Sequence, residues 1–203
     1  MYKRQPPISY IKQSGGLFQD MTIHDFDMAR FIMGYEVEEV YATGNCLVDP
    51  AIAEAGDIDS ANILLKFENG ATATIENSRE AKYGYDQRLE VLCSEGLLKV
   101  ENPVKSDVLV SNYSGTAKDR NLDFFMDRYE NSYFEEMKSF IEALKSGGEM
   151  PVTGEDGIKA MKIAQAANLS MAKNEVVRTP GAAGATVSTE ARRNHGGEEK
   201  MEG

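Results

Sequence analysis

Residues 60–78 read SANILLKFENGATATIENS, and this stretch decides the fold. Two runs of apolar and β-branched residues, 60–67 and 71–78, flank the short sequence Glu68-Asn69-Gly70. Asn-Gly between two such runs is a strong hairpin signal, because both residues tolerate positive φ. The stretch therefore predicts two antiparallel strands joined by a tight turn.

Further strands and three helices are predicted around this hairpin. The strands are expected at residues 38–48, 87–93, 97–100, 108–110 and 176–177. One helix is expected at 21–33 with Gly34 as its stop, and a second around the apolar positions 133–144 with Gly147-Gly148 as its stop. A third is expected to begin at a cap formed by Thr153 with Asp156 and to continue through the Ala-rich stretch 158–172. This order indicates an α+β fold, in which helices cover one face of a largely antiparallel, open sheet.

Composition narrows the class of protein. The chain has 203 residues with 22 Lys and Arg against 33 Asp and Glu, a formal net charge of −11. Nucleic acids and anionic membranes recruit clustered Lys and Arg, so neither is an expected partner. No apolar run approaches the roughly 20 residues of a membrane helix, and no signal-peptide core follows the N-terminus. Cys46 and Cys93 fall on predicted strands, where we expect inert core thiols in a reducing cytoplasm.

The chain divides into three parts by composition. Residues 1–5 are short and basic, and residues 6–179 alternate apolar runs with turn signals. Residues 180–203 contain Val187 and Met201 as their only larger apolar residues. We expect 6–179 to form the folded domain and 180–203 to be disordered, because the tail buries too little surface to offset the entropy of ordering.

Asp20 and His24 are the first candidate site. They are four residues apart at the start of the helix predicted for 21–33. If that helix begins by Asp20, both side chains share a face and can meet. The helix is apolar nearly all round and should be buried, so a carboxylate and an imidazole inside it need partners. A His beside a carboxylate in a cleft suits general-base catalysis near neutral pH.

Two other interpretations of this pair stay open. An Asp at a helix N-terminus complements the helix dipole, so the pair can be purely structural. Asp20, His24 and Asp27 could instead ligate a metal ion, although no further His or Cys supports such a site.

Residues 77–88, NSREAKYGYDQR, form a second candidate site. The segment is dense in hydrogen-bonding groups and contains Asn77 and Tyr83, which suits a polyhydroxylated ligand. A polar strand connection with Tyr packed on it explains the pattern equally well. Asp127-Arg128-Tyr129, just before the helix around 133–144, is most simply a solvated helix start. The chain has no Gly-x-Gly-x-x-Gly fingerprint, phosphate loop or Gly-x-Ser-x-Gly motif.

The run Gly15–Arg30, GGLFQDMTIHDFDMAR, resembles a signature of the Gfo/Idh/MocA oxidoreductases. Segments 77–88 and 124–140 are similar to the inositol 2-dehydrogenase branch of that family, and the resemblance spans residues 6–178. It implies a two-domain enzyme, with a Rossmann domain that binds NAD(P) and a C-terminal α+β domain with an open sheet. This chain resembles the second domain only.

The resemblance also implies roles for particular residues. In the family an Asp-x-x-x-His motif works with a Lys from a Glu-Lys-Pro motif of the Rossmann domain, and Asp20 and His24 match the former. His24 is expected to take the proton of a polyol hydroxyl while hydride passes to NAD, and Asp20 to orient the substrate or the His. Asn77, Tyr83 and Tyr129 are expected to contact the polyol, with myo-inositol as the leading substrate.

The chain departs from the family pattern in ways that bear on whether it is active alone. The Lys and the glycine fingerprint are absent, and residues 1–5 look like a junction scar. We therefore expect the chain alone to lack dehydrogenase activity. The alternative is a non-catalytic ligand-binding or oligomerisation domain. Since the family pairs its sheets face to face, a homo-oligomer through the open sheet face is expected.

Overall fold

A computed structural model describes residues 6–179 of the chain. The expectations for residues 1–5 and 180–203 lie outside the described residues. The described part divides into two compact units, one made of 6–79 with 154–179 and the other of 80–153. Each unit is described by itself.

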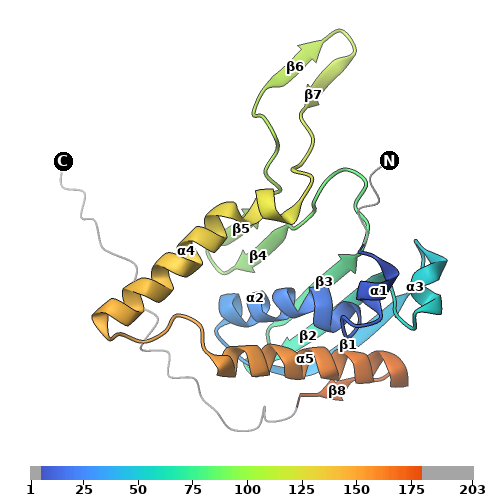
Figure 1. Ribbon diagram of the computed structural model, residues 1–203, viewed down its shortest axis with the longest axis vertical. Coiled ribbons are helices and arrows are strands. Elements are labelled where there is room, and N and C mark those ends of the chain that lie inside the picture. The colour runs from blue at the N-terminus through green and yellow to red at the C-terminus, as the bar shows by residue number, and fades with distance from the viewer. Residues whose placement is uncertain (1–5, 180–203) are drawn as a thin grey trace. The chain divides into compact units, whose positions relative to one another are not determined.

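The first unit is built on an antiparallel sheet with strand order β3-β2-β1-β8 (Figure 1). Its strands are β1 (Val37–Asn45), β2 (Ser60–Phe67), β3 (Thr72–Ser78) and β8 (Val177–Arg178). The predicted hairpin is confirmed, with Ser60 opposite Ser78. Its turn differs from the prediction, because only Gly70 takes positive φ, at 83°. The Gly70 N–H bonds the Phe67 carbonyl at 2.8 Å, so a longer turn with one left-handed glycine closes the hairpin.

Helices cover one face of this sheet. Figure 1 shows α2 (Ile23–Met33) and α5 (Gly154–Lys173) side by side, with α5 packed on β1. Two short helices, α1 (Ile8–Ile11) and α3 (Pro50–Glu54), were not expected from the sequence. The α+β class with helices on one face is confirmed. The core between helices and sheet contains Leu17, Phe18, Phe26, Val37, Val40, Ala42, Ala61, Ile63, Leu65, Phe67, Ile163, Ala164, Ala166 and Ala167.

The helix predicted at 21–33 ends as expected, at Gly34 with φ 66°. The expectation that it is buried all round is wrong. Within α2 only Phe26 and Arg30 are buried, while the Phe31 side chain is 72% exposed. One side of the helix therefore meets the core, and the other stays open to ligands or partners.

The second unit contains two separate ribbons and one long helix. The ribbons pair β4 (Leu89–Cys93) with β5 (Gly96–Val100), and β6 (Leu109–Asn112) with β7 (Gly115–Lys118). The sequence predicted that these strands continue the main sheet, but they form two ribbons that are not part of it. The helix α4 spans Phe125–Ser146 and ends at Gly147, as predicted.

Three smaller predictions are corrected by the structure. Asp127-Arg128-Tyr129 lies inside the first turns of α4 and not before it. Cys93 is exposed and Cys46 is partly exposed, so neither thiol belongs to the core. Both sit near strand ends, where alternation places a side chain on the solvent side as readily as on the core side.

Across residues 6–179, no helix is both long and apolar enough to cross a membrane.

Candidate active site

The first candidate residue, Asp20, lies on a π-helical turn. This turn, η1 (Phe18–Thr22), leads directly into α2. It follows Gly15 and Gly16, both with φ 86°, and the Gly16 carbonyl accepts the Asp20 N–H at 2.9 Å. Phe18 and Thr22 face the core, which anchors the turn. Single π turns at the edge of α-helices occur frequently at functional sites.

The carboxylate of Asp20 is held by two donors. The Tyr10 hydroxyl donates to Oδ1 at 2.6 Å, and Arg79 Nη1 donates to Oδ2 at 2.8 Å. The Asp20 side chain keeps only 10% of its surface exposed. The pKa of the Tyr10 hydroxyl is raised above its ordinary value, first by this hydrogen bond and then by the negative charge of Asp20. Asp20 is thus a fixed acceptor at the start of α2.

His24 lies on the exposed side of α2. Within residues 6–179 its imidazole makes no hydrogen bond or ion pair, so the expected meeting with Asp20 does not occur. The π-helical turn explains this difference, because its wider winding moves Asp20 out of the i, i+4 alignment of a regular α-helix. Asp20 turns to Tyr10 and Arg79, and the ring nitrogens of His24 are left free for a ligand.

Asn77 comes from the end of β3 and binds the same helix. Its Oδ1 accepts the Thr22 hydroxyl, and its Nδ2 donates to Asp25 Oδ2 at 2.9 Å. Burial raises the pKa of Asp25, while the Asn77 bond and the nearby His24 oppose that rise. Asn77 therefore bonds Asp25, the residue next to His24, and both ends of its amide already have partners.

Three residues of this site were not singled out from the sequence: Tyr10, Asp57 and Arg79. Arg79 Nη2 donates to Asp57 Oδ2 at 2.9 Å, which places its guanidinium between two carboxylates. A signal was present, since Arg79 sits in the polar segment 77–88, directly after a strand. Its burial and its partners depend on contacts distant in sequence.

Tyr83 belongs to the second unit, where it borders a polar cluster. Its hydroxyl donates to Asp86, which also accepts a bidentate pair from Arg88 at 2.8 and 2.9 Å. Burial favours a higher pKa for Asp86, but bonds from Arg88, Tyr83 and Asn102 outweigh it and the pKa is lowered. A cavity of about 220 Å³ here is lined by Tyr83, Arg88, Glu101, Asn102, Lys118 and Asn121.

Tyr129 also belongs to the second unit, on α4. Its hydroxyl donates to the Gln87 side chain, and its ring meets Tyr85 edge-on at a centroid distance of 5.8 Å. Tyr129 therefore lies beside Tyr85 and Gln87 of the 77–88 segment. Tyr83 and Tyr129 each have a partner within their unit, and both retain an aromatic surface.

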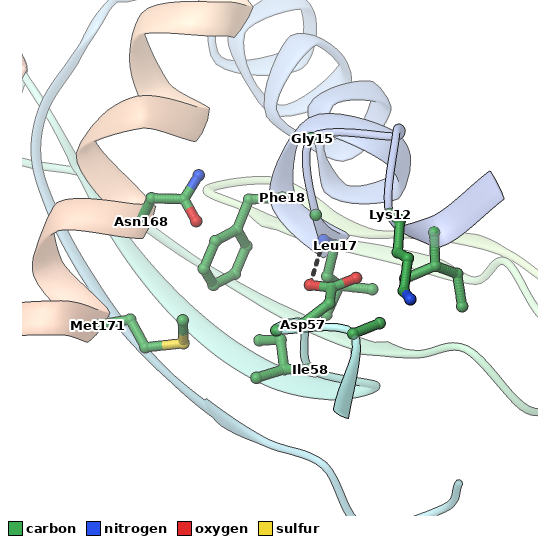
Figure 2. A pocket seen from close by; sticks show the side chains of 12 residues that line it. Lys12, Gly15, Leu17, Phe18, Asp57, Ile58, Asn168 and Met171 are labelled. Carbon is green, nitrogen blue, oxygen red and sulfur yellow. Dashed lines mark hydrogen bonds between the residues drawn. The ribbon is translucent and has the colours of Figure 1, made fainter. Parts of the chain in front are cut away.

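A cavity of about 260 Å³ opens beside η1 in the first unit. Figure 2 shows Asn168 and Met171 reaching it from α5, and the Asp57 carboxylate bonded to the Leu17 N–H, at 3.0 Å. A Cβ on Gly16 would lie only 3.1 Å from Asp57 Oδ1. A dinucleotide pyrophosphate needs free N–H groups at a helix start. Here a carboxylate fills that position, so the start of η1 does not fit the phosphates of NAD.

A metal site is also not supported by the geometry. Among residues 6–179, no three His, Cys, Asp or Glu side chains gather closely enough to hold an ion. Asp27, the third ligand of the metal interpretation, pairs instead with Arg30 at 2.8 Å.

Comparison with known proteins gives consistent matches. Residues 2–99 match the model of the GFO/IDH/MocA C-terminal domain. The chain is 50% identical over 173 residues to myo-inositol 2-dehydrogenase of Thermotoga maritima, covering 85% of this chain and 52% of the relative. The chain spans about half the length of the curated relatives it matches.

Solved structures agree. A myo-inositol dehydrogenase from Corynebacterium glutamicum is 38% identical with a TM-score of 0.83, covering 86% of this chain and 52% of that one. A scyllo-inositol dehydrogenase from Lactobacillus casei, solved with bound NAD(H) and scyllo-inositol, is 29% identical with a TM-score of 0.76. That match covers 84% of this chain and 52% of the other.

Proposed function

Because this chain carries a C-terminal domain of the GFO/IDH/MocA family, we propose that it forms the substrate-binding half of an NAD-dependent inositol 2-dehydrogenase. The proposed reaction oxidises a ring hydroxyl of myo-inositol to a ketone. The observation that carries the proposal is that a fixed acceptor, Asp20, lies four residues before an exposed imidazole, His24, that has no partner among residues 6–179. The proposal includes a role in inositol breakdown in the cytoplasm.

His24 is the residue proposed to accept the proton. Its ring is exposed, so a substrate hydroxyl can reach an imidazole nitrogen without displacing another partner in the described structure. An imidazole is the side chain best suited to general-base catalysis around neutral pH. Asp20, held on both oxygens, keeps lone pairs in a fixed direction and is proposed to orient a neighbouring hydroxyl.

Three further residues are proposed to contact the polyol. Tyr83 is 58% exposed and offers its ring to the C–H face of a sugar-like ring. Tyr129 offers part of its ring beside Tyr85. For Asn77, direct contact requires that the ligand replace Thr22 or Asp25 as its partner.

The cofactor belongs to the proposal, although its phosphates do not fit the start of η1. When bound, NAD supplies the acceptor for the hydride. Since Asp57 fills the helix start and the chain contains no glycine fingerprint, we propose that a separate domain binds the dinucleotide. The purified chain is then expected to give no NADH with myo-inositol.

A chimera tests this function. Residues 6–179 replace the matching half of the Thermotoga maritima relative, and NADH formation is followed with myo-inositol, scyllo-inositol and glucose. We expect activity with an inositol. The remaining half of the relative, expressed without a replacement, is the control and should be inactive. A folded, NAD-binding chimera that oxidises none of these polyols would contradict the proposal.

A second candidate function is assembly through the open face of the main sheet. On β2, residues alternate between buried and exposed, and Leu64 points away from the helices with 45% of its surface exposed. We propose that this face pairs two copies of the chain. Sedimentation equilibrium tests it: a dimer is expected, and Leu64→Asp should weaken it. A monomeric wild-type chain at high concentration would contradict this candidate.

A further inference from the structure

Arg79 is a deeply buried charged side chain beside the proposed site. Only 1% of its side-chain surface is exposed, and its guanidinium lies between Asp20 and Asp57 at 2.8 and 2.9 Å. Its own main-chain N–H donates to the Asp59 carbonyl at 2.8 Å, which continues the pairing of β2 and β3 by one residue. The sheet therefore fixes the backbone position from which the Arg79 side chain extends.

Asp57 fixes the other end of the arrangement. Its Oδ1 accepts the Leu17 N–H, the residue before η1, while Oδ2 accepts Arg79. The arginine thus joins the end of β3 to the start of the π-helical turn that carries Asp20. A Lys at this position would supply one point charge, whereas the planar fork of Arg reaches both carboxylates in defined directions.

This arrangement is costly as a purely structural device. Arg79 Nε is buried and has no hydrogen-bond partner among residues 6–179. An unsatisfied buried donor and a buried charge both lower stability, and apolar replacements of buried ion pairs are often neutral or stabilising. The arrangement lowers stability, but it gives the Asp20 side chain a defined position.

We propose that Arg79 is a positioning residue that holds the Asp20 carboxylate in the direction needed to orient a substrate hydroxyl; this role rests on the proposed function. Without the guanidinium, Tyr10 is the only side chain that bonds Asp20 within the described structure. Tyr10 is itself half exposed, so it gives a weaker constraint.

The Tyr10 hydroxyl provides a test that needs no substrate. Its raised pKa reports the hydrogen bond to Asp20, and it can be titrated with ¹³C-labelled tyrosine, with Tyr10→Phe identifying the signal. In Arg79→Lys the positive charge stays between two carboxylates while the fork is lost. We expect the pKa of Tyr10 to fall toward its ordinary value as Asp20 turns away. Arg30→Lys is the matched control, since Arg30 is also buried with carboxylates but does not touch Asp20.

The paired variant Arg79→Gln/Asp57→Asn keeps the net charge but removes the Arg79 cation, which by itself lowers the pKa of Tyr10, so a fall in this variant can only reflect the lost hydrogen bond to Asp20. A Tyr10 titration identical to wild type in folded Arg79 variants would overturn the inference. A fall of the pKa in the Arg79 variants but not in Arg30→Lys would support it. This result stands whether or not the protein acts on inositol, so the two proposals fail separately.

Activity of the chimera gives the functional half of the test. Arg79→Lys is expected to lower kcat/KM for myo-inositol about tenfold. In an Asp20→Asn background the same substitution should cause no further loss, because Arg79 acts through Asp20. Losses that multiply independently in the double variant would place the effect of Arg79 elsewhere and overturn the inference.

Discussion

The main-chain N–H of Val48 donates a 2.8 Å hydrogen bond to Asp59, whose side chain is fully buried at the start of β2. The same carboxylate accepts the N–H groups of Leu47 and Asp49 and the thiol of Cys46. Asp59 therefore holds the loop after β1 against the start of β2, the strand that pairs with β3.

Asp59→Asn should destabilise the first unit by about 3 kcal/mol, because an amide cannot accept all of these bonds and brings an NH₂ group against N–H donors. The free energy of unfolding in urea measures the loss. Asp49→Asn is the matched control. Asp49 caps α3 by accepting the Ala51 N–H, and Asn caps a helix about as well as Asp. Equal stability of the two variants would contradict the role given to Asp59.

The same carboxylate predicts a pH dependence. Burial alone favours a higher pKa for Asp59, but the three backbone N–H bonds and the thiol lower it from 3.8 to about 2. Because the folded-state pKa is lowered, the stabilisation is fully present above the unfolded pKa and is lost as the pH falls toward about 2. Urea unfolding between neutral pH and pH 2 should show a larger fall in wild type than in Asp59→Asn, in which only the other carboxylates with lowered pKa values contribute. Parallel curves would contradict the assignment.

Much of the fold could be predicted from local pattern. The hairpin at 60–78, the helix stops at Gly34 and Gly147 and the α+β class all follow from periodicity and turn residues. The separation of β4–β7 into two ribbons could not be predicted, because alternation marks a strand without naming its partner. The π-helical turn was also missed, since a π turn and an α turn share the same apolar spacing to within one residue.

The site was predictable in part for a similar reason. Asp20 and His24 are four residues apart and form a recognisable motif. The residues that hold Asp20 are distant in sequence: Tyr10 is 10 residues away and Arg79 is 59 residues away. Such contacts depend on the sheet that brings β3 beside η1, which no single segment of the sequence contains.

Gly84→Ala should destabilise the second unit by about 2 kcal/mol or more. Gly84 has φ 127°, and an added Cβ would lie 2.6 Å from the Cβ of Asn121 and 3.0 Å from the Leu122 carbonyl. Hydrogen exchange at Tyr85 is the measurement, since its N–H donates to that carbonyl at 2.7 Å and should exchange faster in the variant. Gly96→Ala, which meets no atom within 4 Å, is the control and should leave this rate unchanged.

His24→Gln should separate chemistry from stability. The side chain is exposed and makes no hydrogen bond within residues 6–179, so the free energy of unfolding should change by less than about 0.5 kcal/mol. In the chimera with the relative's half, kcat for myo-inositol should fall about 10²- to 10⁴-fold, the usual contribution of a general base. Met161→Gln, a polar replacement of an exposed residue on α5, is the control and should preserve kcat. If His24→Gln retained wild-type kcat in a folded chimera, another group would have to take the proton, and the assignment of His24 as the base would be wrong.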